Sequence, residues 1–296
     1  MILVTGGSGF IGSYVTDLLQ KRGYKVRSID TKIPKREACE DFVKGSILDK
    51  KAISRAMKGC SAVLHLAAQV DVQASIKDPS YDFKTNALGT LLLLEEARKN
   101  HVEKFIYASS AAVYGMPSSL PISESHPASP ISPYGVSKLT GEKYVGLYSS
   151  LYSMNTTALR LFNVYGKGQN PKSPYSGVIT KFSSRIGNGL PPVIFGDGRQ
   201  TRDFVHVSDV ANAFLLALKS KGGNGGAINI GTGKETTLNK LAKVMVELSG
   251  KKLKPIYKEA REGDIKRSVA DISKAGKLLG FKPKVSLREG LSSLMP

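Results

Sequence analysis

A glycine-rich run, VTGGSGFIGS, restricts the fold of this chain more strongly than any other stretch. It places glycines at positions 6, 7, 9 and 12, between a short apolar segment and an amphipathic one. Between a strand and a helix, such glycines let the backbone turn tightly, come close to a pyrophosphate and pack helix on strand. The helix N-terminus then offers free N–H groups to the phosphates. The run therefore predicts a dinucleotide site at one strand of a parallel sheet.

Strand-like and helix-like segments alternate over the first half of the chain. Apolar runs such as ILVTG, SAVLHLAA and KFIYASS are separated by helical patterns such as FIGSYVTDLLQKRG. This alternation predicts an α/β fold, a Rossmann-type doubly wound parallel sheet flanked by helices. After about residue 163 the loops become longer and richer in Gly and Pro. We expect a dinucleotide-binding domain over 1–163 and a smaller substrate-binding domain over 164–296, of which residues 203–235 partly return to the main sheet.

An acidic residue strengthens the prediction of a dinucleotide site. Asp30 ends the second expected strand, about 20 residues after the glycine loop, where a carboxylate can accept hydrogen bonds from ribose hydroxyls. Its negative charge would repel a 2′-phosphate, which favours NAD. Lys32, Lys35 and Arg36 lie nearby and leave NADP open.

A tyrosine and a lysine lie four residues apart in SPYGVSKLTGE. Tyr134 and Lys138 therefore share one face of an expected helix. A free tyrosine is a poor base near neutral pH, and a cation beside it lowers the pKa of the phenol. With Ser109 and Ser110 at the tip of the strand KFIYA and a hydride acceptor, this pair makes a consistent site for alcohol oxidation. Chance placement on a surface helix is the competing interpretation.

Composition restricts the class of protein. The 296 residues are 41% apolar and 23% charged, as in globular proteins. Cys39 and Cys60 are the two cysteines, and their spacing indicates neither a disulfide framework nor a metal site. No membrane-spanning run or export signal is evident, so we expect a cytoplasmic protein. The net charge of +19 comes from scattered lysines without a nucleic-acid-binding motif, which argues against a specific nucleic-acid partner.

Six motifs follow one another over most of the chain: TGGSGFIG, HLAAQ, SSAAVYG, YxxxK, LRLFNVYG and GDGRQTRDFVHVSDV. In this order the chain resembles the extended short-chain dehydrogenase/reductase family, and is most similar to its NAD-dependent nucleotide-sugar epimerases of the UDP-glucose 4-epimerase type. The resemblance implies a UDP-galactose/UDP-glucose isomerase of galactose metabolism that works through a transient 4-keto sugar. UDP-N-acetylhexosamine 4-epimerases, nucleotide-sugar dehydratases or reductases, and a non-enzymatic dinucleotide-binding regulator are the alternatives.

The same resemblance assigns roles to individual residues. Tyr134 is the general base for the sugar 4-hydroxyl, Lys138 binds the nicotinamide ribose and lowers the pKa of Tyr134, and Ser110 bonds to the reacting oxygen. The implied NAD contacts are Gly6, Gly9, Phe10, Ile11, Asp30, Ser46, Ile47, Leu66, Ala67, Ala68, Asn86, Ser109, Tyr134, Lys138 and Phe162. The implied nucleotide-sugar contacts are Ser110, Tyr134, Asn163, Val178, Val193, Phe195, Arg202, Arg261 and Asp264, with the two arginines at the pyrophosphate.

Three departures from related motifs bear on the reaction and the substrate. Ser46 stands where the family usually has an adenine-binding aspartate, which weakens one hydrogen bond. Ala111 and Ala112 stand where related dehydratases have acids, and alanines cannot move the protons that dehydration requires. Ser268 replaces a bulky tyrosine of some epimerases, so a 2-N-acetyl group could also fit.

Structural explanations compete with several of these assignments. Arg202 could form a local ion pair with Asp203, and Phe195 could belong to the core. His65 and His206 are better explained as structural residues than as catalysts, since no triad or metal site requires them.

The oligomeric state follows from two expected helices. Residues 80–99 and 131–152 carry apolar stripes, which could be internal core. In the resembling family the corresponding helices pair two subunits. We therefore expect a homodimer.

Overall fold

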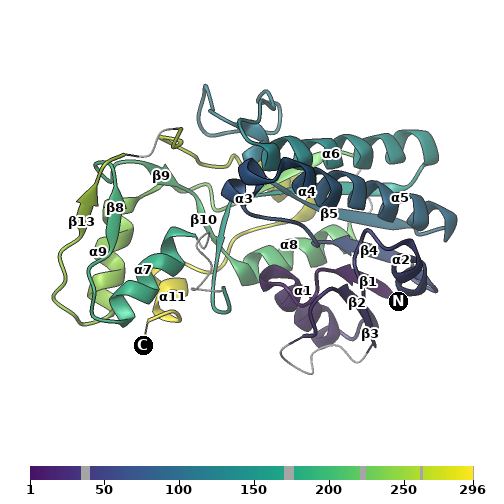
Figure 1. Ribbon diagram of the computed structural model, residues 1–296, viewed down its shortest axis with the longest axis horizontal. Coiled ribbons are helices and arrows are strands. Elements are labelled where there is room, and N and C mark those ends of the chain that lie inside the picture. The colour runs from purple at the N-terminus through teal and green to yellow at the C-terminus, as the bar shows by residue number, and fades with distance from the viewer. Residues whose placement is uncertain (35–40, 170–176, 221–224, 261–262, 296) are drawn as a thin grey trace.

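Seven parallel strands form the main sheet of the computed structural model, in the order β11-β6-β5-β4-β1-β2-β3 (Figure 1). They are β1 (Ile2–Thr5), β2 (Val26–Asp30), β3 (Asp41–Lys44), β4 (Ala62–His65), β5 (Lys104–Ser110), β6 (Asn155–Leu161) and β11 (Ala227–Ile230). The structure describes residues 1–34, 41–169, 177–220, 225–260 and 263–295. Strand order reverses between β1 and β4, and ligands bind at the carboxyl ends of strands beside such a reversal. The predicted Rossmann fold is confirmed.

Helices cover both faces of this sheet (Figure 1). One face carries α2 (Lys50–Met57), α5 (Gly89–Lys99) and α6 (Pro133–Tyr152), and the other carries α1 (Phe10–Lys21), α8 (Val207–Lys219) and α10 (Ser273–Leu279). Successive strand residues point to opposite faces, so Leu3 and Phe105 join the first core while Val4 and Ile106 join the second.

Short polar caps set where several helices begin. Asp49 accepts hydrogen bonds from the backbone N–H groups of Lys51 and Ala52 at the start of α2. Ser132 accepts from the Gly135 N–H at the start of α6, so the helix expected over 131–152 begins at Pro133. These caps satisfy N–H groups that have no partner inside the helix.

The helix expected over 80–99 is not regular. It consists of α4 (Pro79–Phe83), a π-helical turn η1 (Lys84–Leu88) and α5, and it follows the short helix α3 (Val72–Lys77). Asn86 lies inside the π-helical turn, and such turns are frequent at functional sites. None of the described helices is both long enough and apolar enough to cross a membrane, and the cytoplasmic location stays a prediction.

A second lobe lies beyond the carboxyl ends of the strands (Figure 1). Its elements are β7 (Asn163–Tyr165), α7 (Val178–Gly187), β8 (Val193–Phe195), β9 (Thr201–Arg202), β10 (Phe204–His206), β12 (Thr236–Thr237), α9 (Leu238–Leu248), β13 (Ile256–Lys258) and α11 (Leu287–Ser292). A separate cluster of buried residues from α7, α9 and α11 forms its core. Within residues 203–235, α8 packs on the main sheet and β11 pairs with β6, so this part of the chain returns to the main sheet. We keep residue 163 as the proposed domain boundary.

Candidate active site

The glycine loop forms a tight cradle between β1 and α1. Gly6 has a φ of +72°, which favours glycine, and a Cβ there would lie 2.7 Å from the Ala67 backbone nitrogen. A Cβ on Gly12 would lie 2.0 Å from the Gly6 carbonyl oxygen. Gly9 is the N-cap of α1 and has no side chain to occupy the first N–H groups of the helix. The cradle is therefore shaped for close approach by an anion such as a pyrophosphate.

The predicted cofactor residues gather around this cradle. Asp30 ends β2 beside the loop, where its carboxylate accepts hydrogen bonds from the N–H groups of Ser8 (3.1 Å) and Lys32 (2.9 Å). The segment after β4 is fixed by the Thr5 hydroxyl, which accepts from the N–H groups of Leu66 (3.2 Å) and Ala67 (3.1 Å). These contacts bring the first, second and fourth strands' carboxyl ends together, as a dinucleotide site requires.

Other predicted cofactor residues are already engaged within the protein. The Ser46 hydroxyl accepts from the Leu48 N–H at 3.1 Å. Ile47 is buried against α5, where a Cβ on Gly89 would lie 2.7 Å from its Cδ1. Phe162 is buried and its N–H donates to the Ile230 carbonyl at 3.0 Å.

The catalytic candidates meet at the carboxyl end of β5. Tyr134 and Lys138 are both buried on α6, one helical turn apart. The Lys138 ammonium donates to the Ala108 carbonyl at 2.9 Å and lies 4.9 Å from the centre of the Tyr107 ring. The Ser110 hydroxyl is hydrogen-bonded to Tyr134 and also accepts from the Ala112 N–H at 3.2 Å. A hydroxyl, a phenol and an ammonium thus share one site.

Burial shifts the pKa of both Tyr134 and Lys138. Burial raises the pKa of Tyr134, and the hydrogen bond with Ser110 acts in the opposite direction. The lowering of the Tyr134 pKa by Lys138 stays a prediction. Burial also lowers the pKa of Lys138 to about 8, while Asp82 and Glu142 act to raise it.

Asn86 is buried and forms hydrogen bonds with both the loop after β4 and helix α6. Its side-chain amide donates to the Gln69 carbonyl (2.9 Å), Asp82 Oδ1 (3.0 Å) and the Ser137 hydroxyl (3.1 Å). Its amide oxygen accepts from the Gln69 N–H at 2.8 Å. Sequence reasoning found Asn86 but missed Asp82, although a spacing of four residues in a helix would have placed the two on one face.

A second buried network holds the tip of β5. The Ser109 hydroxyl donates to Glu142, whose carboxylate is paired with Arg160 at 2.8 Å. Arg160 also donates to the Tyr114 hydroxyl at 2.9 Å, and Tyr114 donates to Asn229 at 2.6 Å. Ser109 is therefore tied through α6 and β6 to β11, which fixes the strand end that carries Ser110.

The predicted nucleotide-sugar residues lie in the second lobe. Asn163 is exposed on β7, and Val178 opens α7 after the N-cap Gly177, which has no side chain. Val193 and Phe195 are half-buried on β8, with Ile194 between them in the core. Phe195 is thus not a simple core residue.

The arginine proposed for the pyrophosphate is paired within the lobe. Arg202 donates to Asp264 at 2.5 Å and to the carbonyls of Thr201 (2.8 Å) and Ile265 (2.6 Å). The alternative ion pair with Asp203 is wrong, because Asp203 is buried and accepts from Thr232, Gly233 and Ala270 instead.

Some residues named from the sequence lie outside the described part of the chain. They are Lys35, Arg36, Cys39 and Arg261.

Two histidines have structural partners. His65 bonds to the hydroxyls of Thr5 (2.8 Å) and Thr90 (2.9 Å), and burial lowers its pKa to about 3. His206 caps α8 by accepting from the Ser208 N–H at 3.3 Å. Both agree with the structural interpretation.

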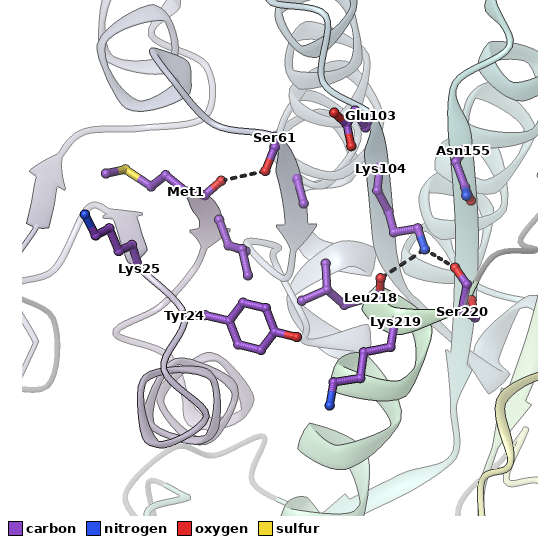
Figure 2. Close-up of a pocket in the computed structure, with 12 residues that line it drawn as sticks. Met1, Tyr24, Lys25, Ser61, Glu103, Lys104, Asn155, Leu218, Lys219 and Ser220 are labelled. Atoms are coloured by element: carbon purple, nitrogen blue, oxygen red, sulfur yellow. Dashed lines mark hydrogen bonds between the residues drawn. The ribbon is translucent and has the colours of Figure 1, made fainter.

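A pocket of about 510 Å³ lies at the opposite edge of the main sheet (Figure 2). There the Lys104 ammonium caps the end of α8, because it donates to the carbonyls of Leu218 (3.0 Å) and Ser220. None of the predicted site residues lines this pocket. The candidate active site is therefore the carboxyl edge.

Comparison with known proteins agrees with this geometry. The NAD dependent epimerase/dehydratase family matches residues 2–231. A protein of Methanocaldococcus jannaschii described as a putative UDP-glucose 4-epimerase is 44% identical over 304 residues, covering 100% of this chain and 97% of the relative.

Two solved structures are similar over nearly their full length. The UDP-glucose 4-epimerase of Thermotoga maritima with UDP-glucose has a TM-score of 0.93 and 41% identity, covering 99% of this chain and 96% of that one. The UDP-N-acetylglucosamine 4-epimerase of Methanobrevibacter ruminantium, in complex with UDP-N-acetylmuramic acid, has a TM-score of 0.93 and 36% identity over the same shares.

Proposed function

Because the chain belongs to the NAD dependent epimerase/dehydratase family, we propose that it interconverts UDP-galactose and UDP-glucose by epimerisation at C4. One observation carries the proposal. Ser110, Tyr134 and Lys138 meet at the carboxyl end of β5, while the next turn, η2 (Ala111–Tyr114), begins with two alanines. This set can remove and return a hydroxyl proton, but it lacks the acids that would divert a keto sugar to dehydration.

The residues present fit NAD. A side chain at Gly12 would collide with the Gly6 carbonyl, so glycine is needed to pack the start of α1 closely on the loop. This close packing would place the N-terminus of α1 at the pyrophosphate. Asp30 would accept from the adenosine ribose, and Lys138 would hold the nicotinamide ribose. When bound, NAD would supply the hydride acceptor for C4 of the sugar and the hydride donor for the return step.

The protein's part in the reaction is proton transfer and orientation. Tyr134 takes the proton of the 4-hydroxyl as the C4–O bond becomes a carbonyl, and gives it back when the carbonyl is reduced. Ser110 donates to the same oxygen and fixes its position. Because burial raises the pKa of Tyr134, the phenol keeps its proton at neutral pH until positive charge reaches it with the ligands.

The second lobe would hold the UDP group. Arg202, together with Arg261, would bind the pyrophosphate through a planar guanidinium that is always charged. Asp264 already orients Arg202 and would also accept from the uridine ribose. Val178, Val193 and Phe195 would line the uracil, and Asn163 would bond to the sugar or its phosphate.

A UDP-N-acetylhexosamine is the second candidate substrate. Ser268 is buried in a segment that joins the two halves of the site: the Lys266 carbonyl accepts from the Thr201 N–H at 2.9 Å, and the Val269 carbonyl accepts from the Ile122 N–H at 2.8 Å. A small residue at this junction leaves room for a 2-N-acetyl group. Ser268→Tyr should then reduce turnover of UDP-N-acetylgalactosamine far more than that of UDP-galactose.

The homodimer also remains a proposal, with support from an apolar face on α3, α4 and α6. Large apolar side chains are exposed there: Ile76, Tyr81, Phe83, Val136, Leu147 and Leu151. A second copy of the chain would cover them. Light scattering at micromolar concentration should give a mass near twice 31.8 kDa, and a mass of one chain would contradict the proposal.

The direct test of the reaction is incubation with UDP-galactose, with the bound dinucleotide identified in the same sample. UDP-glucose should form without added cofactor. The matched control is Tyr134→Phe, which keeps the ring and removes the proton carrier. A product that has lost water, or no product from protein with confirmed NAD, would refute the proposed activity.

A further inference from the structure

Asp82 is a buried acid that the proposed reaction does not use. It lies on α4, and its side chain is 0% exposed. Its Oδ1 accepts from Asn86 at 3.0 Å and from the Gln69 side chain at 3.2 Å. Its Oδ2 is also buried and has no hydrogen-bond partner among the residues that the structure describes. A buried carboxylate is costly unless a nearby positive charge compensates it.

The contacts of Asp82 lead to the catalytic helix. Asn86 bridges Asp82 on α4 and Ser137 on α6, and the Ser137 hydroxyl donates to the Tyr134 carbonyl at 3.0 Å. Helices α4 and α6 are packed against each other. Asp82 is therefore linked, through Asn86 and Ser137, to the turn of α6 that carries Tyr134 and Lys138.

Lys138 is the cation whose charge acts on Asp82. Burial raises the pKa of Asp82, whereas the Ser137 hydroxyl and the Lys138 ammonium lower it. Burial lowers the pKa of Lys138, and Asp82 is the largest influence that raises it, ahead of Glu142. Glu142 is already paired with Arg160, so its charge is largely balanced. That leaves Asp82 as the counter-charge of Lys138.

The other titratable groups around Lys138 are uncharged at neutral pH. Burial lowers the pKa of His65 on β4 to about 3, which keeps its ring neutral. Burial raises the pKa of Tyr107 on β5 and of Tyr134 on α6, so both phenols keep their protons. The charged groups near this part of α6 are thus the Arg160–Glu142 ion pair, the Lys138 ammonium and the Asp82 carboxylate.

We propose that Asp82 is a positioning residue of the catalytic site, whose buried carboxylate keeps Lys138 as an ammonium and, through Asn86, holds α4 against the catalytic face of α6. The expected effect of Asp82 on turnover rests on the proposed function, whereas the electrostatic interaction between Asp82 and Lys138 does not. Asp82 touches neither substrate nor cofactor in this scheme and acts through Lys138.

The first test is the pH dependence of turnover of UDP-galactose by the NAD-loaded enzyme. In Asp82→Asn the lysine loses its proton at lower pH, so activity should fall about tenfold or more at about pH 8 and much less at about pH 6.5. Asp82→Glu keeps the charge and should restore the alkaline limit of the wild type. A loss in Asp82→Asn that is equal at all pH values would overturn the proposal.

The matched control is Asp209→Asn. Asp209 is also a buried aspartate, but it accepts from the N–H groups of Lys284 (3.0 Å) and Val285 (3.1 Å), far along the chain from α6. This substitution should lower stability without moving the alkaline limit of turnover. A shift equal to that of Asp82→Asn would contradict a specific role for Asp82.

The second test needs no activity. Urea unfolding compares wild type and Asp82→Asn at equal bound-NAD content. The variant should have the lower free energy of unfolding, and the difference should narrow between about pH 6.5 and about pH 8.5, because neutral Lys138 needs no counter-charge. A constant deficit would overturn the proposal. If Asp82→Asn is unfolded at neutral pH, it should fold at about pH 8.5, and failure at both pH values is a refutation. A narrowing deficit in a protein that does not epimerise UDP-galactose would refute only the proposed function.

Discussion

Replacing Lys138 by methionine should remove a specific pH dependence from the stability of the protein. In the folded chain the pKa of Lys138 is about 8, against 10.5 for a free lysine. Between those two values the Lys138 side chain carries a proton in the unfolded chain but not in the folded chain, so the free energy of unfolding of the wild type rises with pH. Below about pH 8 the side chain is protonated in both states and adds no pH dependence. The difference, 10.5 − 8 = 2.5 units, corresponds to about 3 kcal/mol at ~1.36 kcal/mol per unit.

The assay is urea unfolding at several pH values between about 7 and 10.5, on protein freed of bound dinucleotide. The free-energy difference between wild type and Lys138→Met should increase by about 3 kcal/mol in favour of wild type from pH 8 upward. Lys143→Met, at an exposed position on the same helix, is the control, and its difference from wild type should not depend on pH. If the Lys138→Met difference is also flat, Lys138 is not a buried ammonium and the electrostatic description of the site is wrong.

Three further substitutions separate cofactor binding, stability and proton transfer. Gly12→Ala places a Cβ 2.0 Å from the Gly6 carbonyl oxygen and should abolish retention of NAD through purification, measured by release of the nucleotide on denaturation; full retention would contradict the cradle. Arg160→Met leaves Glu142 buried without its partner and should cost about 3–5 kcal/mol in urea unfolding, whereas a cost below ~1 kcal/mol would show that the pair is not needed. Tyr134→Phe should lower kcat about 10²–10⁴-fold with NAD still bound, and a smaller effect would remove Tyr134 as the base.

The sheet and the cofactor side of the site could be predicted because they depend on local patterns. The glycine loop, the acid at Asp30 and the alternation of apolar runs each follow from backbone geometry over a few residues. Parallel strands then place their carboxyl ends along one edge. The position of Ser110 beside Tyr134 follows from that edge and from the start of α6.

Other features depend on tertiary contacts that no local pattern states. Asp82 resembles any polar residue of an exposed helix until α4 packs on α6 and buries it. The partner of Arg202 is Asp264, 62 residues away, rather than the adjacent Asp203. The pKa of Tyr134 depends on its burial and on its hydrogen bond with Ser110, and neither is fixed by a spacing of four residues.

The most direct test of the proposed reaction is the fate of the hydrogen at C4. UDP-galactose carrying deuterium at C4 should be converted to UDP-glucose that keeps the deuterium at C4, because the same hydride leaves and returns within one closed site. Mass spectrometry of the isolated product measures this. Retention in nearly every molecule is the expected result, and UDP-glucose with hydrogen from solvent at C4, or no UDP-glucose at all, would contradict it.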